Sequence, residues 1–403
     1  MKDYKLPTLK ERNLPVANVP QEELEEKKVK IIKAFTEIDF KIEHIKVTLG
    51  PRVSLWEITP AGGQDVSIVE ENKDWLLLHL YETGCRMICP IPVNGTIGIE
   101  IPNRYYEKLT LGALLSTKEF RNFDMELPLA IGQTVDGKPY IIDLVKAPHI
   151  LIGGTFGGGQ GMREHSMIAS LLCSKTPEEV KMVFLDPKRV EFTDYGWITP
   201  FLAKIPDMEG PIATDIKDCV KTLNSLCTLM EHRYDLLRST DSRNIKDYNE
   251  KVKNDMPYIV CFIDEFRDLI MTAGKEFELP LIRLAQMSRA VGIHIIMSTH
   301  RLTNSVMTSI IKANIPCRIS GRVSNISEST AILDTSDAEC LSEPGDTMVL
   351  NNGLQRVQGA YVDQKNDIAY ICAQIMGQGL SVEEYLLPKP ECEFVDPPTT
   401  ENR

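Results

Sequence analysis

Residues 149–172 read HILIGGTFGGGQGMREHSMIASLL, and this stretch decides the fold. A short apolar run ends in a glycine-rich turn, which continues into a segment with helical spacing of apolar residues. A glycine-rich turn between a strand and a helix aims several backbone N–H groups at one point, where the N-terminus of the helix adds partial positive charge. The stretch therefore predicts a phosphate-binding loop, although the glycines could also serve only to make a tight turn.

The loop departs from the phosphate-loop consensus G-x-x-x-x-G-K-[ST], which would begin at Gly154. Gln160 stands where the consensus has Lys, and Gly161 stands where it has Ser or Thr. A glutamine donates a hydrogen bond but neutralises no charge, and a glycine has no hydroxyl for Mg²⁺. The consensus side chains are lost, whereas the backbone part of the site is retained at Gly154, Thr155, Gly157, Gly158 and Gly159.

Apolar runs alternate with helical segments on both sides of this loop. YIIDL, KMVFL, YIVCFI, IHIIMS and CRIS are expected to be strands, and residues 216–239 a long helix. This alternation predicts an α/β fold with a mostly parallel sheet covered on both faces. Turns are expected at Asn94-Gly95 and at Asp136-Gly137, because these dipeptides favour tight hairpins.

Four parts are expected along the chain. Residues 1–27 are polar, and a helix expected over 21–38 crosses into the small α/β domain of residues 28–105, which has a second helix over 66–84. Residues 106–376 form the nucleotide-binding domain, and residues 377–403 form a Pro-rich tail expected to be mobile.

Composition narrows the class of protein. The 403 residues carry a net charge of −12, which argues against a broad nucleic-acid-binding surface but permits a local basic track. No apolar run reaches about 18 residues and the N-terminus lacks a signal peptide, so a cytoplasmic protein without a membrane segment is expected. The ten cysteines, including Cys85 and Cys89, are expected to be reduced core residues rather than disulfides or metal ligands.

Two further strand ends carry polar residues. In YIVCFIDEF, Asp264 is suited to position Mg²⁺ through water and Glu265 to polarise an attacking water. In IIMSTHR, a strand delivers His300 and Arg301 to the edge where ligands of open α/β sheets bind. Solvated acids at a strand end and a loop histidine are the plainer alternatives.

Taken in order, these segments resemble the motor portion of the FtsK/SpoIIIE DNA translocases over about residues 28–376. The resemblance rests on LGPRVSLWEI, LPLAIGQTVDGKPYIIDLVKAPHILIGGT, FLDPKRVEF, PYIVCFIDEFRDLIM, LIRLAQMSRAVGIHIIMSTHR and PGDTMVL. It implies a small first domain followed by a RecA-like P-loop domain, assembled as a hexameric ring around double-stranded DNA. It further implies ATP and Mg²⁺ as cofactors, with the phosphates on Gly154 to Gly161 and with Asp264 and Glu265 as the metal-positioning and catalytic acids.

The departures from the family pattern predict slow ATP hydrolysis. His300 falls where the family usually has Gln, and Thr330 falls where it has an arginine that reaches a neighbour's ATP. An arginine finger alone is worth about 10³–10⁵ in rate, so hydrolysis is expected to be very slow unless another cation substitutes. Arg163, Lys188 and Arg322 are the nearest cations in sequence. The family's membrane-spanning region and its C-terminal winged-helix module are not expected in this chain.

Two functions remain open at this point. One is a DNA translocase subunit whose ATP binding or hydrolysis is impaired. The other is a pseudo-ATPase that serves as a scaffold or DNA-binding ring subunit beside an active paralogue. An engineered inactivation fits less well, because the helix turn GMREHS after the loop departs from the family as well.

Overall fold

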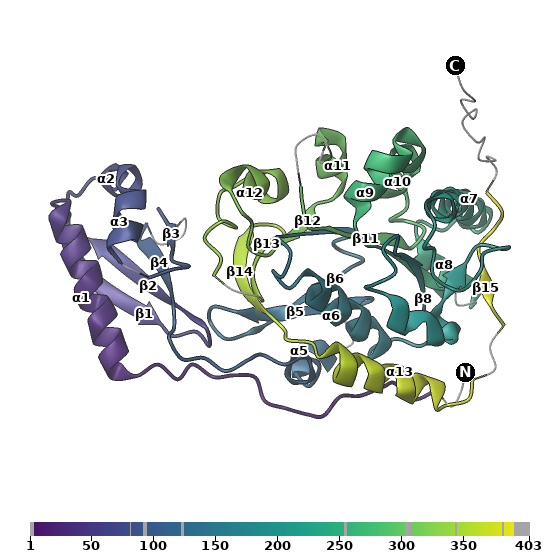
Figure 1. Cartoon of the computed structure of the whole chain (residues 1–403), viewed down its shortest axis with the longest axis horizontal. Coiled ribbons are helices and arrows are strands. Elements are labelled where there is room, and N and C mark those ends of the chain that lie inside the picture. The colour runs from purple at the N-terminus through teal and green to yellow at the C-terminus, as the bar shows by residue number, and fades with distance from the viewer. Residues whose placement is uncertain are drawn as a thin grey trace, which may run out of the picture.

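Two large sheets divide the chain between them in the computed structural model. The structure describes residues 4–390 apart from 81, 92–94, 122–124, 254–255, 303–305, 307, 343–344 and 381–382. The sheets lie side by side along the longest axis of the molecule, the smaller one built from the first part of the chain (Figure 1).

The smaller sheet is antiparallel, in the order β1-β2-β4-β3, and packs against helices. Its elements are α1 (Gln21–Glu37), β1 (Ile42–Thr48), β2 (Val53–Pro60), α2 (Ser67–Glu71), α3 (Lys73–His79), β3 (Arg86–Ile88) and β4 (Ile97–Pro102). Helix α1 buries Ile31 and Phe35, which are one helical turn apart, in a core that also holds Trp56. A small α/β domain is therefore present, as predicted.

The helix predicted over 66–84 differs from the structure, and the turn predicted at Asn94-Gly95 lies partly outside the described residues. The single helix expected over 66–84 is instead two short helices, α2 and α3, which meet at Asn72. The Asn72 side chain donates a hydrogen bond to the backbone oxygen of Ile68, the kind of local bond by which asparagine competes with a continuous helix. The turn predicted at Asn94-Gly95 falls partly outside the described residues, because Asn94 is not among them.

The larger sheet has nine strands among the described residues, in the order β6-β5-β14-β13-β12-β7-β11-β10-β8. The five strands from β12 to β8 pair in parallel, and the four from β6 to β13 extend the sheet with antiparallel pairings. The strands are β5 (Pro128–Thr134), β6 (Pro139–Asp143), β7 (His149–Gly153), β8 (Val180–Leu185), β10 (Tyr258–Ile263), β11 (Ile293–Thr299), β12 (Cys317–Ser320), β13 (Asp346–Leu350) and β14 (Leu354–Gly359). The predicted α/β class is confirmed, and its parallel part carries the glycine-rich loop.

The hairpin predicted at Asp136-Gly137 is confirmed. It joins β5 to β6, with the Thr134 amide donating to the Lys138 oxygen at 2.8 Å. Gly137 has φ +82°, a left-handed conformation that glycine adopts without a steric cost.

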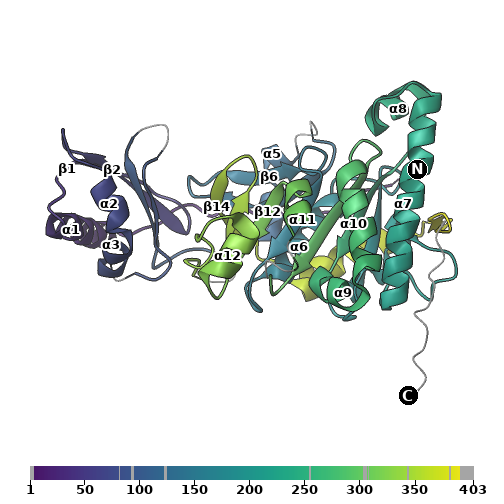
Figure 2. The same ribbon diagram turned by 90° about the horizontal axis from the view of Figure 1, so that it is seen from above.

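Helices cover both faces of the larger sheet (Figure 1), and Figure 2 looks down onto the helices of one face. One face packs against α6 (Gln160–Leu172) and α13 (Ala369–Met376). The other packs against α7 (Ile216–Ser239), α9 (Phe266–Ala273), α10 (Lys275–Met287), α11 (Ser309–Asn314) and α12 (Ile326–Leu333). Shorter helices are α4 (Leu111–Leu115), α5 (Lys118–Arg121) and α8 (Ile245–Val252).

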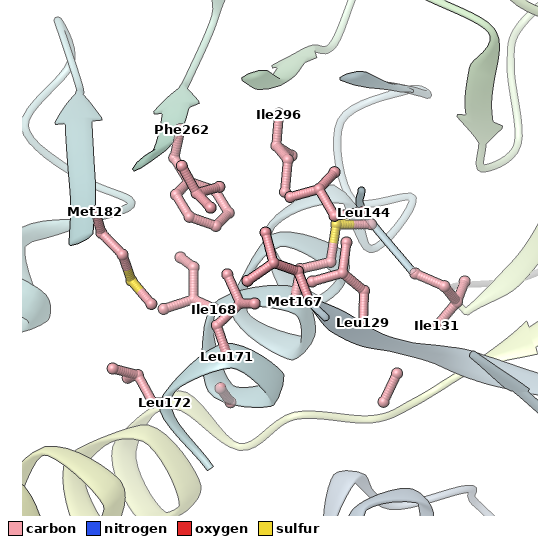
Figure 3. Packing of buried hydrophobic residues seen from close by; sticks show 14 of the residues in the cluster. Leu129, Ile131, Leu144, Met167, Ile168, Leu171, Leu172, Met182, Phe262 and Ile296 are labelled. Atoms are coloured by element: carbon pink, nitrogen blue, oxygen red, sulfur yellow. The ribbon is translucent and has the colours of Figure 1, made fainter. Parts of the chain in front are cut away.

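Helix α6 is anchored by close packing under the sheet. Met167, Ile168 and Leu171 point into a cluster with Phe262 and Ile296 from the neighbouring strands (Figure 3). All five side chains are fully buried. Because this packing fixes the helix, the loop that precedes it is also held in place.

Segments near both ends of the described part of the chain lie against the larger domain. Residues 4–20 form no helix or strand and run along its edge to α1 (Figure 1), and we call this segment the strap. The side chains of Gln374 and Gln378 each bond both backbone groups of one strap residue, Thr8 and Lys5 respectively, at 2.8–3.1 Å. The strap is therefore held on α13 by paired amide contacts.

The described part of the C-terminal segment is also packed. Strand β15 (Tyr385–Leu386) pairs in parallel with β9 (Ala203–Lys204), and the side chain of Leu387 is buried. This segment is thus not the mobile tail that was expected. The four-part division of the chain stays a prediction.

A buried ionic cluster joins the two domains, and we call it the junction cluster: Arg86, Glu100, Asp337, Asp346 and Arg356. Arg356 pairs with Asp346 at 2.6 Å and with Glu100 of the small sheet at 3.4 Å. Arg86 pairs with the same Glu100 at 3.4 Å and with Asp337 at 2.6 Å. The small domain is therefore attached to strands β13 and β14 through charges that have partners.

Candidate nucleotide site

The glycine-rich loop lies at the carboxyl edge of the parallel strands. β7 is flanked by β12 and β11, so that Gly153 is aligned with Ser320 on one side and with Thr299 on the other. Gly154, Gly157 and Gly159 all have positive φ, at +152°, +80° and +81°. Only glycine adopts these angles without strain, so the loop keeps the backbone shape that aims N–H groups at a bound anion.

The loop is tied to the end of β12. The Thr155 amide and hydroxyl both donate to the backbone oxygen of Arg322, at 2.8 and 3.1 Å. The Gly158 amide donates to the Thr155 oxygen at 2.9 Å. These contacts use one side of the loop and hold it in one conformation.

Asp264 and Glu265 lie two strands away, at the end of β10. Asp264 is buried and accepts a hydrogen bond from the Ser298 hydroxyl at 3.1 Å. Burial, reinforced by the charge of Glu265, raises the pKa of Asp264 to about 7. Asp264 is therefore a mixture of neutral and ionised forms at neutral pH.

Glu265 has the contacts of a held carboxylate. Its φ is +46°, a left-handed backbone conformation that is uncommon for a residue other than glycine. One carboxylate oxygen accepts from the His300 amide at 2.7 Å and the other lies 3.0 Å from the Lys188 ammonium. Strained backbone and double anchoring are features of residues that a site holds in one orientation.

The structure brings His300 to the loop. The His300 ring lies 5.2 Å from the ring of Phe156, which projects from the loop with 87% of its surface exposed. Burial lowers the pKa of His300, so the ring is neutral at neutral pH. Arg301 is exposed. Thr330 is also exposed, and its hydroxyl donates to the Ile326 oxygen of its own helix.

The first turns of α6 bury charged and polar side chains. Gln160 is 3% exposed and its amide oxygen has no partner among the described residues. Glu164 is fully buried, and burial raises its pKa well above its ordinary value. His165 is buried against the Tyr195 hydroxyl at 2.8 Å, and burial lowers the pKa of His165 to about 4.

Another carboxylate fills the place of the missing consensus hydroxyl. A side chain at Gly161 would overlap the Glu191 carboxylate. That carboxylate lies 3.4 Å from His165, and burial near Asp186 raises the pKa of Glu191. The residue beside the loop is therefore an acid where the consensus has Ser or Thr.

A cavity of about 320 Å³ lies beside the first turn of α6, where Met162 lines it. Its walls come from both domains and the segment between them: Arg52, Tyr106, Lys108, Leu109, Met162, Gly345, Gln358, Gly359, Ala360 and Tyr361. Arg52 lies 4.3 Å from the ring of Tyr106, and Lys108 lies 4.8 Å from the ring of Tyr361. Aromatic rings, aliphatic surface and a few polar groups suit a flat heterocycle joined to phosphates in the loop.

These residues fit a nucleotide better than a metal. The loop and the cavity together match phosphates and a base, whereas Gly161 gives a metal no ligand. No group of three or more His, Cys, Asp or Glu side chains in the described part of the chain is placed to hold a metal ion. Mg²⁺ can still bind chiefly through nucleotide phosphates and water, with few protein ligands.

Sequence reasoning missed the cavity and Glu191. Both depend on contacts between segments far apart in the chain, and no local pattern marks them. One signal was present for the buried charges of α6, since MREH interrupts a helix whose neighbours are apolar. No helix among the residues that the structure describes is both long and apolar enough to cross a membrane.

Comparisons with known proteins agree with this geometry. Residues 110–304 match the FtsK/SpoIIIE family and residues 5–103 match the FtsK alpha domain. The chain is 39% identical over 361 residues to a protein of Chlorobaculum tepidum named DNA translocase FtsK, an alignment that covers 87% of this chain and 45% of that protein. It is 35% identical to the DNA translocase FtsK of Oceanobacillus iheyensis, over 98% of this chain and 51% of that protein. The chain thus spans about half the length of the curated relatives it matches.

Solved structures resemble the fold. The pCW3 conjugation coupling protein TcpA with ATPγS has a TM-score of 0.61 at 21% identity, covering 88% of this chain and 100% of that one. The cytoplasmic domain of the type VII secretion ATPase EccC from Thermomonospora curvata has a TM-score of 0.58 at 22% identity, covering 70% of this chain and 36% of that one. At these identities the likeness concerns the fold alone.

Proposed function

Because the chain belongs to the FtsK/SpoIIIE family, we propose that it is the motor part of a double-stranded DNA translocase that acts in DNA segregation or DNA transfer. The observation that carries this proposal is the identity of 35–39% to proteins named DNA translocase FtsK along 87–98% of this chain. The proposal places the protein in the cytoplasm, where such a motor meets DNA, and makes duplex DNA its substrate.

ATP binds in this proposal across the loop and the cavity. Gly154 to Gly161 would hold its phosphates, and the cavity lined by Tyr106 and Tyr361 would hold its base. Asp264 would hold Mg²⁺ through water, Glu265 would orient an attacking water, and His300, with Arg301 next to it in the chain, would sense the terminal phosphate. The metal would neutralise phosphate charge when bound.

Hydrolysis is impaired in this proposal because two charges and one ligand are missing. Gln160 is buried and uncharged, and Gly161 has the Glu191 carboxylate beside it instead of a hydroxyl. Thr330 supplies no cation to a neighbouring site. Each change weakens the stabilisation of charge in the transition state, which is the main source of catalysis in phosphoryl transfer.

The motor acts as an oligomer in this proposal, as a hexameric ring around the duplex. Exposed apolar side chains on α9 and α10, with Met271 65% and Leu279 61% exposed, support an interface on that side of the molecule. The net charge of −12 is compatible with a ring, because only the channel has to be basic.

A second function is favoured by one observation, the Glu191 carboxylate next to the loop. An acid beside the phosphate site repels the terminal phosphates of ATP. The chain would then be a pseudo-ATPase, a scaffold or DNA-binding ring subunit that works beside an active paralogue.

One experiment separates the two functions. ATP hydrolysis is measured with and without duplex DNA, for the wild type and for the double variant Gln160→Lys/Gly161→Ser. Slow turnover that DNA stimulates supports an impaired motor. DNA binding without turnover, together with turnover in the double variant, supports the pseudo-ATPase. A wild type that neither binds DNA nor hydrolyses ATP would rule out both.

A further inference from the structure

Three cations lie close enough to the loop in sequence to replace the missing lysine, and the structure separates them. Lys188 is paired with Glu265 at 3.0 Å and with Asp268 at 3.4 Å. Arg322 is exposed, and its backbone rather than its side chain holds the loop. Arg163 is the candidate that lies directly against the loop.

Arg163 comes from the first turn of α6 and is only 5% exposed. Its Nε and Nη2 donate to the hydroxyl of Thr347 on β13, at 3.0 and 2.9 Å, and Nη2 also donates to the Asp346 backbone oxygen at 3.4 Å. Nη1 is buried and has no hydrogen-bond partner among the residues that the structure describes. One end of the guanidinium is thus anchored while the other keeps an unused donor.

The backbone around Arg163 is shaped to admit the guanidinium. A Cβ at Gly321 would lie 2.6 Å from Nη2 and 2.9 Å from Nη1, so the end of β12 approaches this closely only because residue 321 is glycine. A Cβ at Gly159, within the loop, would lie 3.8 Å from Nη1. The unused donor is therefore on the side of the guanidinium that borders the loop.

The charge of Arg163 lacks a counter-ion among the described residues. Its hydrogen bonds go to a hydroxyl and a carbonyl, and the neighbouring carboxylate of Asp346 is paired with Arg356 at 2.6 Å. Burial lowers the pKa of Arg163 to about 10, which leaves it cationic at neutral pH. A buried cation without an anion is costly, and an anion bound in the adjacent loop would offset that cost.

We propose that Arg163 is a positioning residue that supplies, from beneath the phosphate loop, the positive charge that Gln160 does not provide. It acts through the loop backbone and at short range on the phosphates, and it touches no reacting atom. The cation has moved from the last loop position to one helical turn further along α6. This inference rests on the proposed nucleotide site.

The test compares ligands with and without phosphate. The affinities of ADP, ATP and adenosine are measured by calorimetry for the wild type, Arg163→Met and Arg163→Lys. Arg283→Met is the control, since Arg283 is an exposed arginine paired with Glu231 on the helices of the other face. We expect Arg163→Met to weaken ADP and ATP at least about tenfold, equivalent to about 1.4 kcal/mol, and to leave adenosine unchanged.

The conservative variant adds a readout that a packing role would not give. Arg163→Lys should keep most of the ADP affinity at pH 7 and lose it as the pH rises. Burial lowers the pKa of a lysine below its ordinary value of about 10.4, so the lysine loses its charge over this range. Wild-type affinity should stay flat over the same range.

Each other outcome has one meaning. If ADP binds Arg163→Met as tightly as the wild type, Arg163 is not the replacing cation and the proposed function stands. If ADP and adenosine weaken by the same factor, the role of Arg163 is only structural. If the wild type binds none of the three ligands, the proposed nucleotide site itself is wrong.

Discussion

The junction cluster and the acids under the phosphate loop bury charge in opposite ways. At the junction, the carboxylates of Glu100, Asp337 and Asp346 all pair with arginines at 2.6–3.4 Å. Near the loop, Glu164 is fully buried and has no ion pair within the described part of the chain, and one carboxylate oxygen of Asp186 has no hydrogen-bond partner there. The carboxylates of both regions are removed from water, but only those at the junction are paired with cations.

This difference separates structure from function. Paired buried charges fix the position of the small domain, and their geometry is complete without a ligand. Unpaired buried charges destabilise the folded chain, and natural proteins retain them mainly where a ligand or a reaction needs them. The loop region therefore has the features of a binding site, and the junction cluster those of a structural contact between the two domains.

The largest expected effect is at the junction. Arg356→Met removes the partner of Asp346 and one partner of Glu100, which leaves buried carboxylates uncompensated. We expect the free energy of unfolding to fall by about 3–5 kcal/mol, as is typical when one partner of a buried pair is removed. Equilibrium unfolding in urea measures this change.

The matched control for that variant is Arg104→Met. Arg104 also pairs with an acid, Glu26 at 2.7 Å, but both side chains are largely exposed. Unfolding of this variant should match that of the wild type, because exposed ion pairs contribute little. Equal effects of the two variants would mean that burial does not distinguish the junction.

An intermediate effect, a gain in stability rather than a loss, is expected when the buried acids near the loop, Asp264 and Glu164, are replaced by amides. The folded chain holds Asp264 and Glu164 with raised pKa values, so the stability that their neutral forms contribute is present at low pH and is lost as the pH rises. For Asp264 the loss covers the window from about pH 4 to about pH 7, given its pKa of about 7. Glu164→Gln should therefore be more stable than the wild type at pH 8, and this gain should shrink towards pH 5.

Thermal unfolding between pH 5 and pH 9 measures this effect. Glu71→Gln, an exposed position on α2, is the control and should leave the curve unchanged. Asp264→Asn should flatten the fall in stability near neutral pH. If Glu164→Gln raises the stability by the same amount at every pH, the gain does not come from removing a buried charge and the explanation is wrong.

The smallest expected effect is at Gly161. A serine there collides with the Glu191 carboxylate, but that carboxylate ends a flexible side chain that is 26% exposed and is able to turn away. Gly161→Ser should cost less than about 1 kcal/mol, and Glu191→Ala in the same chain should remove the cost. A double-mutant cycle measures the coupling, and no coupling would mean that Glu191 does not occupy that place.

The parallel strands were predictable because each is a continuous apolar run that ends in glycine or polar residues. HILIG and YIVCFI have this pattern, and both are fully buried strands. The long helix over 216–239 was also predicted, and α7 has these bounds. Strands β13 and β14 were not predicted as strands, because LQRVQG mixes buried and exposed positions.

The site was predictable only where it is local. The loop and the strand ends follow from short segments, and the structure brings Glu265, His300 and Phe156 together. The cavity and Glu191 depend on the tertiary fold, since Arg52 and Gln358 meet across 300 residues of chain. Buried charge is also hidden from pattern reading, which assigns residues such as Glu164 to the surface.

The strap has a consequence for the order in which the chain folds. Lys5 and Thr8 precede their partners Gln378 and Gln374 by more than 360 residues. During synthesis the small domain and the parallel sheet have time to form before the strap finds its place on α13. Docking of the strap is thus a late step in the folding of this part of the chain.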